Sequence, residues 1–262
     1  NKDCTNLEAM RPRLTYKKKK KNVQVQDVHL INSSFWTNHI YRSNHVKFID
    51  CYIYAPTSGI KAPSSDAIDI DYCHDVLVHG CYMSVNDDAV VLKGGKGTWA
   101  DKDTTNGPNY NVIVEDCKYG VVHGCLTFGS ESLNDRNIIF RRCDVHNANR
   151  VIWLKMRLDT PQHYEYLSFE DVTSDCSSFL VVLPWTQFYN LEKRDNMPMS
   201  MCNNINFKNI KVKSENFMDV GKSDKYILRD FHFENCNIQN EADLLEEGTI
   251  QNMTLKNVKM NG

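Results

Sequence analysis

The fold is decided by a six-residue pattern whose clearest copy reads Val112-Ile113-Val114-Glu115-Asp116-Cys117. Two apolar residues alternate with other types, a polar joint follows, and a small apolar residue ends the pattern. Further copies begin at Val23, Val46, Val76, Ile138, Leu167, Ile205, Phe231 and Met253. Copies that recur along a whole chain indicate a repeat architecture, in which each copy is one unit of a stack.

The spacing of the copies decides which architecture this is. Successive copies begin 22 to 38 residues apart, the shortest step being that from Phe231 to Met253. Alternation of period two with β-branched residues inside is typical of short strands, and the longer steps then carry loops. Leucine-rich repeats share the period but require leucine framing and a helical half, which this chain lacks. We therefore expect an all-β chain that forms a single right-handed parallel β-helix of about nine rungs.

Five of the ten cysteines occupy the last position of the repeat. They are Cys51, Cys81, Cys117, Cys143 and Cys236. Other copies have valine or isoleucine there, so we interpret these cysteines as a column of small buried residues and not as disulfide partners. The remaining five, Cys4, Cys73, Cys125, Cys176 and Cys202, have no assigned place, and no Cys-x-x-Cys pair of a zinc site occurs.

Composition narrows the domain organisation and the functional class. The 262 residues carry 31 Lys+Arg and 33 Asp+Glu, a net charge of −2 that excludes a strongly basic nucleic-acid binder. The sequence contains no run of about 18 apolar residues, the length that a membrane-spanning helix requires. We expect one domain over residues 1–262, with an irregular edge over 1–21 and a loop insertion over 94–110. The lysines of 17–21 are interpreted as a solvated turn, and further rungs are expected before Asn1 because no cap precedes the stack.

Residues able to do chemistry gather on four consecutive rungs. The candidates are Asp66, Asp87, Asp88, His123, Trp153, Lys155 and Arg157. Asp66 and Asp88 are 22 residues apart, one short rung, so they should stack at about 4.8 Å of backbone separation. Alternation sends Ile152, Leu154 and Met156 inward, which places Trp153, Lys155 and Arg157 together on the outer face.

Such a set fits the hydrolysis of an acidic sugar polymer. Neighbouring carboxyl groups raise one another's pKa, so one can stay protonated as an acid while another acts as a base. Glycoside hydrolysis needs that division of roles. A Trp face suits a sugar ring, and Lys or Arg suits a sugar carboxylate. Each Asp alone would fit an Asx turn, and paired Asp could bind Ca²⁺, although an EF-hand-like ligand series is absent.

At these residues the sequence resembles glycoside hydrolase family 28, the polygalacturonases and related pectinases. The family signatures are Asn-Thr-Asp-Gly-(Ile/Leu)-Asp, Asp-Asp, Gly-His-Gly followed by Gly-Ser, and Arg-Ile-Lys. They are similar, in order, to Ser64–Asp69, Asn86–Asp88, Val122–Glu131 and Trp153–Lys155. The resemblance implies a right-handed parallel β-helix and an inverting hydrolase of α-linked galacturonate that needs no metal or other cofactor.

The resemblance also implies a role for each residue. Asp87 is similar to the proton-donating acid, and Asp66 and Asp88 are similar to the pair that activates water. His123 is similar to a residue that tunes the acid, and Lys155 to a ligand of the substrate carboxylate. Asp87 and Asp88 can share a cleft only if the strand begins or bends there.

Departures from the family pattern leave the exact glycan open. Trp153 replaces the family Arg, and Arg157, two residues beyond Lys155, is expected to supply that cation. The substrate could then be polygalacturonan or rhamnogalacturonan, and the insertion beside the site favours exo action.

Two other functions stay open on the sequence alone. A calcium-dependent polysaccharide lyase could use the Asp-rich and Lys-bearing rungs, and a non-catalytic glycan-binding β-helix could keep the same surface. Under the leading hypothesis the partner is an acidic polysaccharide, with no nucleic acid and no membrane span. We expect a monomer that is secreted or periplasmic and acts on the cell wall.

Overall fold

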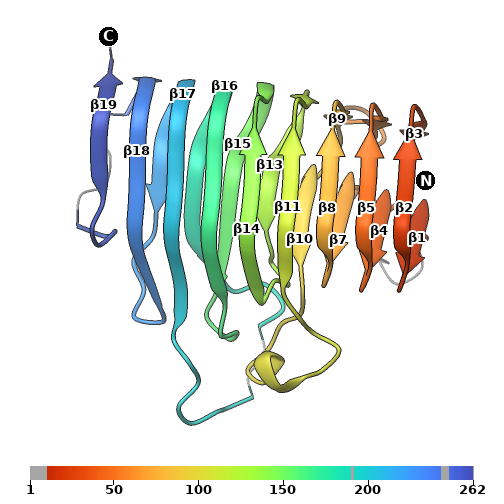
Figure 1. Ribbon diagram of the computed structural model, residues 1–262, viewed down its shortest axis with the longest axis horizontal. Coiled ribbons are helices and arrows are strands. Elements are labelled where there is room, and N and C mark those ends of the chain that lie inside the picture. Colours follow the sequence, from red (N-terminus) through yellow and green to blue (C-terminus); the bar gives the residue numbers. More distant parts are fainter. Residues whose placement is uncertain (1–10, 190–191, 243–247, 262) are drawn as a thin grey trace.

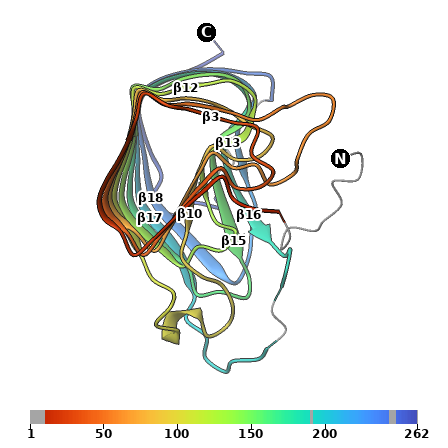
Figure 2. The same cartoon turned by 90° about the vertical axis from the view of Figure 1, so that its right-hand side faces the viewer.

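The structure, a computed structural model, describes residues 11–189, 192–242 and 248–261. The strands pair in parallel and wind into a right-handed β-helix, seen from the side in Figure 1 and along its axis in Figure 2. They are β1 (Thr15–Lys18), β2 (Lys21–Gln26), β3 (His29–Ile31), β4 (Asn38–Tyr41), β5 (Asn44–Ile49), β6 (Tyr52–Tyr54), β7 (Ile68–Asp71), β8 (His74–His79), β9 (Tyr82–Ser84), β10 (Val90–Lys93), β11 (Asn109–Glu115), β12 (Lys118–Tyr119), β13 (Val122–Phe128), β14 (Asn134–Arg141), β15 (Asp144–Arg157), β16 (His163–Trp185), β17 (Ser200–Val220), β18 (Tyr226–Asn240) and β19 (Thr254–Met260). The predicted fold is confirmed. In the described part of the chain, no helix is long and apolar enough to cross a membrane.

Each coil contributes to three ladders of parallel strands that run along the axis. One ladder joins β1, β4, β7, β10 and β13, a second joins β2, β5, β8, β11 and β14, and a third joins β3, β6, β9 and β12. From β15 onward, single long strands turn corners: β15 serves two ladders, and β16 and β17 each serve all three. The first residues of β15 pair with β12 and its last residues pair with β13.

The polar joint of the repeat is a one-residue turn in the left-handed region. In every copy the residue just before the last position of the repeat has φ between 50° and 65°, and these residues are Asp27, Asp50, Gly80, Asp116, Arg142, Asp171, Asn209, Asn235 and Asn257. Asn, Asp and Gly adopt this region at the lowest cost, which explains their frequency at the joint. Stacked amides also bond along the axis, with Nδ2 of Asn257 donating to Oδ1 of Asn235 at 2.8 Å.

The small residues after the joint form the predicted column. Lys118 pairs with Tyr82 on one side and with Asp144 on the other, which places Cys117 between Cys81 and Cys143. The five repeat cysteines are at most 2% exposed, and the nine cysteines within the described residues are free thiols. Of the unassigned cysteines, Cys4 lies outside the described residues and the other four are buried in the core.

Phenylalanines extend the core at the preceding inward position of the repeat. Phe169, Phe207 and Phe233 follow one another on successive coils, with ring centroids 5.2 Å and 4.3 Å apart. Each ring is at most 1% exposed, and burying one contributes about 1.5 to 3 kcal/mol. This buried column packs successive coils against one another and thereby fixes the positions of the outward-facing residues.

The expectation of an irregular edge through residue 21 is wrong for the described residues. Strand β1 pairs with β4 from Thr15 onward, and β2 begins at Lys21. The lysine run therefore includes the end of one strand, a corner at Lys19 with φ of 53°, and the start of the next strand. Residues 1–10 lie outside the described part.

Candidate active site

The three predicted aspartates lie ahead of two neighbouring strands of one ladder. Ile68 of β7 is paired with Val90 of β10, so Asp66 and Asp88 occupy equivalent places on adjacent coils. The amide of Ala67 donates to the carbonyl of Asp88 at 3.1 Å. Strand β10 begins at Val90, and Asp87 and Asp88 therefore lie in the irregular segment before it. The 22-residue spacing and the need for a strand start here could both be predicted from the sequence.

A cavity of about 270 Å³ brings most of the candidates together. Its lining includes Asp66, Asp87, Asp88, His123, Trp153 and Lys155, which are six of the seven predicted site residues. His123 comes from β13, whose Leu126 is paired with Val90, so the histidine follows Asp87 on the next coil. The amide of His123 donates to the carbonyl of Asp87 at 2.9 Å.

The best-defined ion pair in the cavity joins Lys155 and Asp88. Nζ of Lys155 lies 2.9 Å from Oδ2 of Asp88, and the side chains are 9% and 2% exposed. Burial at this level requires pairing, because an isolated charge away from water is costly. The contact fixes the position of Lys155 against Asp88 inside the cavity.

Asp87 and His123 form a second, more open pair. Nδ1 of His123 is 3.4 Å from Oδ1 of Asp87. The hydrogen bond to Asp87 raises the pKa of His123. Burial alone would raise the pKa of Asp87, but the hydrogen bond and the charge of His123 hold that pKa below its ordinary value. The lowered pKa favours the ionised form of Asp87, which differs from the resting state expected of a proton donor.

The carboxyl groups with a raised pKa are instead Asp66, which lines the cavity, and its neighbour Asp69, which does not. Burial, with the charges of Asp87 and Asp69, raises the pKa of Asp66 well above its ordinary value. Burial also raises the pKa of Asp69 to about 8. Asp69 is fully buried in strand β7. Both carboxyl groups therefore bind protons more tightly than an exposed aspartate does.

Arg157 does not supply the cation that was expected from it. It is 1% exposed and outside the residues that line the cavity. Its guanidinium donates to both carboxylate oxygens of Asp159, at 2.8 Å and 2.7 Å, and to the carbonyls of Gln187 and Phe188. The chain after β16 folds over it, which strand alternation cannot reveal. Arg157 instead anchors a segment whose Gln187 and Phe188 do line the cavity.

Sequence analysis missed Lys93, Trp36 and Trp185, whereas Trp153 was among the predicted residues. Lys155 lies 4.0 Å from the ring centroid of Trp153 and 4.9 Å from that of Trp185, and Lys93 lies 4.8 Å from that of Trp36. These residues all line the cavity. The alternation that found Lys155 also places Lys93 on the outer face of β10. Nothing local marks the two tryptophans, which come from other coils.

Two loops project from the same side of the coils (Figure 1), and Gln187 and Phe188 of one of them line the cavity. Residues 94–108 connect β10 to β11 and carry the 3-10 turn Ala100–Lys102, and residues 186–189 and 192–199 lie between β16 and β17. Arg194 joins them through Asp101, with contacts of 2.5 Å and 3.1 Å, and lies over the Trp99 ring. Lys96 pairs with Glu131 at 3.5 Å and lies 5.1 Å from the Phe188 centroid, so the insertion reaches the edge of the site.

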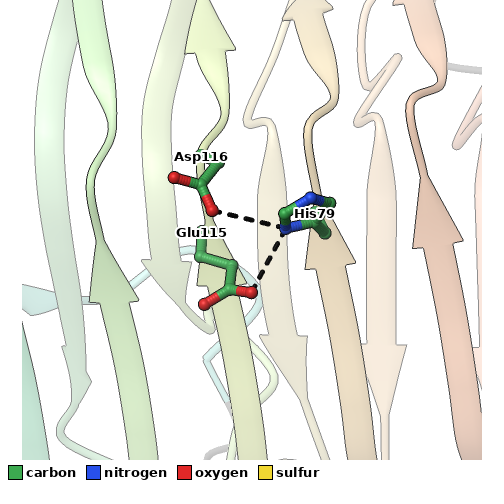
Figure 3. Close-up of side chains that lie close together, drawn as sticks. All are labelled: His79, Glu115 and Asp116. Carbon is green, nitrogen blue, oxygen red and sulfur yellow. Dashed lines mark hydrogen bonds and ion pairs between the residues drawn. The ribbon is translucent and has the colours of Figure 1, made fainter.

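A separate cluster of possible metal ligands lies on another face (Figure 3). Nδ1 of His79 is 3.2 Å from Oε1 of Glu115 and 3.4 Å from Oδ2 of Asp116. Arg141 and Arg142 approach the same carboxylates at 2.7 Å to 2.9 Å. Two guanidinium groups already neutralise the acidic residues, so this donor set fits a surface ion-pair network better than a metal site.

Comparison with known proteins gives one family. The model of glycosyl hydrolases family 28 matches residues 1–261. A protein named "Probable polygalacturonase" from Vitis vinifera is 29% identical over 89 residues, which are 34% of this chain and 18% of that protein.

Solved structures with this fold include several pectinases. An exopolygalacturonase from Thermotoga maritima has a TM-score of 0.79 and 24% identity, and the match covers 96% of this chain and 55% of that one. A family 28 exopolygalacturonase from Yersinia enterocolitica has a TM-score of 0.73 and 14% identity, covering 92% and 42%. Endopolygalacturonase I from Stereum purpureum, solved with two galacturonate, has a TM-score of 0.62 and 13% identity, covering 93% and 69%. The chain thus spans about half the length of the first two structures.

Proposed function

Because the chain belongs to glycosyl hydrolase family 28, we propose that it is an inverting hydrolase of α-linked galacturonate in pectic polysaccharide. The observation that carries this proposal is the buried pair of Lys155 and Asp88, set among further carboxyl groups in one cavity. Carboxyl groups in different environments can divide the roles of acid and base. An ammonium beside them is a ligand for the carboxylate of an acidic sugar.

In the proposed reaction, water attacks the anomeric carbon as the glycosidic bond breaks. Asp87 gives a proton to the leaving oxygen, while Asp66 and Asp88 orient the water and one of them takes its proton. In an inverting enzyme the acid and base carboxyl groups lie about 6.5 to 9.5 Å apart, which leaves room for the water between them. The start of β10 lets Asp87 and Asp88 serve opposite sides of the bond.

His123 is the proposed source of the proton that Asp87 donates. Contact with Asp87 raises the pKa of His123, so the imidazole holds a proton in mildly acidic solution. As a substrate displaces water, the carboxylate of Asp87 loses solvation and its affinity for that proton increases. Asp87 can then pass it to the leaving oxygen.

The aromatic residues and loops are proposed to shape the substrate site. The ring of Trp153, in place of the family Arg, lies 4.0 Å from the cations of both Arg150 and Lys155, and Lys155 is left as the ligand of the sugar carboxylate. The joined loops over 94–108 and 186–199 would close one end of the cleft and favour release of single residues from chain ends. The likeness to two exopolygalacturonases supports this exo action. Pectic polymers are extracellular, so we propose a secreted or periplasmic enzyme that acts as a monomer.

Product analysis on polygalacturonate and rhamnogalacturonan, with EDTA present, tests the proposal. The wild type should form reducing ends without unsaturated products, Asp87→Asn should lose this activity, and Asp116→Asn, a matched change on another face, should keep it. Release of monomers only would support exo action. Unsaturated products that require calcium would identify a lyase, and the absence of any product with retained glycan binding would identify a binding module.

A further inference from the structure

A second buried ammonium, that of Lys93, lines the same cavity as Lys155. Lys93 ends β10, and Lys155 occupies the same column two coils further on, with Gly129 between them. Lys93 is 7% exposed. An ammonium persists at such a place only when its charge is compensated.

Lys93 is held between two acidic groups. Its Nζ lies 3.3 Å from Oε2 of Glu131 and 4.0 Å from Oδ1 of Asp69. Nζ of Lys93 also donates a hydrogen bond to the carbonyl of Gly129 at 3.4 Å. Asp69 is fully buried, and neither of its oxygens has a hydrogen-bond partner among the described residues. The ammonium therefore stabilises a carboxyl group that has little other compensation.

The charges around Lys93 come from each element packed against it. Asp66 precedes β7, Asp69 and Asp71 lie on β7, and Asp88 precedes β10. Glu131 follows β13 with Lys96 beside it, Lys155 lies on β15, and His39 of β4 binds Asp71 at 3.0 Å. Among these groups, Lys93 lowers the pKa of both Asp66 and Asp69 against the effect of burial. Burial opposes ionisation of Glu131 too, but Lys93 and Lys96 lower its pKa to about 2.

On the basis of the proposed function, we propose that Lys93 is a positioning residue in the hydrolysis. Its ammonium, held 3.3 Å from Glu131 and 4.0 Å from Asp69, stabilises the ionised form of the Asp66–Asp69 pair against the cost of burial. Asp66 can then accept the proton of the attacking water as the water oxygen bonds to the anomeric carbon. Lys93 itself neither gains nor loses a proton in this step.

The test is the pH profile of kcat for Lys93→Met, Lys93→Arg and Glu131→Gln. Lys93→Met removes the charge but keeps most of the volume. At the low-pH side of the profile kcat should fall about 100-fold, the lower range of a general-base contribution, while KM changes little. The acidic limb should move to higher pH, because a carboxyl group without its cation ionises later. Lys93→Arg should restore the wild-type limb.

Glu131→Gln provides the opposite change. It removes the negative charge that offsets Lys93, so the field of Lys93 on Asp66 and Asp69 increases and the acidic limb should move to lower pH. If Lys93 and Glu131 only fill space, Lys93→Met and Glu131→Gln should both lower thermal stability, and their acidic limbs should not move in opposite directions. That result would overturn the proposal. A rise in KM at an unchanged limb would overturn it too, by assigning Lys93 to substrate binding.

An infrared titration of the buried carboxyl groups does not depend on activity. In Lys93→Met the protonated carboxyl signal should persist to higher pH than in the wild type, and Asp66→Asn in the same background should remove part of it. Identical titrations of variant and wild type would contradict the inference. A wild type that hydrolyses no pectic substrate would refute the proposed function alone, and the infrared result would still decide the role of Lys93.

Discussion

The ammonium of Lys155 lies 2.9 Å from a carboxylate oxygen of Asp88, although 67 residues separate the two along the chain. Both side chains are buried, so each depends on the other for compensation of its charge. A substrate carboxylate that binds Lys155 would share this ammonium with Asp88.

Lys155→Met should therefore weaken folding as well as substrate binding. Loss of one partner of a buried pair costs about 3 to 5 kcal/mol, because the other charge is left without compensation. Adding Asp88→Asn should recover most of that loss. Chemical denaturation measures the free energy of unfolding, and Lys118→Met, an exposed lysine on β12, is the matched control. If the double variant is no more stable than Lys155→Met, the pair is not coupled.

Arg157 should behave as a structural anchor. Its ion pair with Asp159 is fully buried, so Arg157→Gln should lower the free energy of unfolding by about 3 to 5 kcal/mol, and Arg157→Gln with Asp159→Asn should lower it less. Arg229→Gln, on the exposed face of β18, should change stability by less than about 0.5 kcal/mol. An effect of Arg157→Lys on KM for acidic oligosaccharides at unchanged stability would instead restore Arg157 as a substrate ligand.

The pair of His123 and Asp87 should stabilise the fold in a limited pH window. The pKa of Asp87 is lowered in the folded state, so its contribution is present above its unfolded pKa of 3.8 and is lost as the pH falls. The pKa of His123 is raised, so its contribution is present below 6.5 and is lost as the pH rises through the folded value. The melting temperature of His123→Asn should therefore fall furthest below that of the wild type between these values. A difference that is constant across pH 3 to 9 would exclude this linkage.

The left-handed joints should tolerate glycine better than branched residues. Asn235 has φ of 56°, and a β-branched side chain in this region costs about 1 to 3 kcal/mol. Asn235→Val should lower the free energy of unfolding by that amount, and it also removes the amide that accepts from Asn257. Asn235→Gly should lose only the amide contacts. Cys236→Val, one residue further along, is the control and should lower the free energy of unfolding by less than about 1.5 kcal/mol. Equal losses for the glycine and valine variants would show that backbone conformation is not limiting.

The repeat and its direct structural consequences could be predicted from the sequence. Period-two alternation and the joints fix which residues face inward, because these are local properties of a strand and a turn. The cysteine column and the equivalent places of Asp66 and Asp88 result from counting residues within one coil. The relative positions of these residues could be predicted without knowing how the loops fold.

Tertiary structure decided what the loops and distant coils bring to the cavity. Trp36 meets Lys93, and Trp185 meets Lys155, each from another coil. Arg157 is covered by the segment after β16. Where the protons reside also depended on these contacts. Sequence spacing brings Asp66 and Asp87 together, but burial raises the pKa of one while the charge of His123 lowers that of the other. Burial and field strength depend on everything packed around a group, and that environment is set only when the whole coil closes.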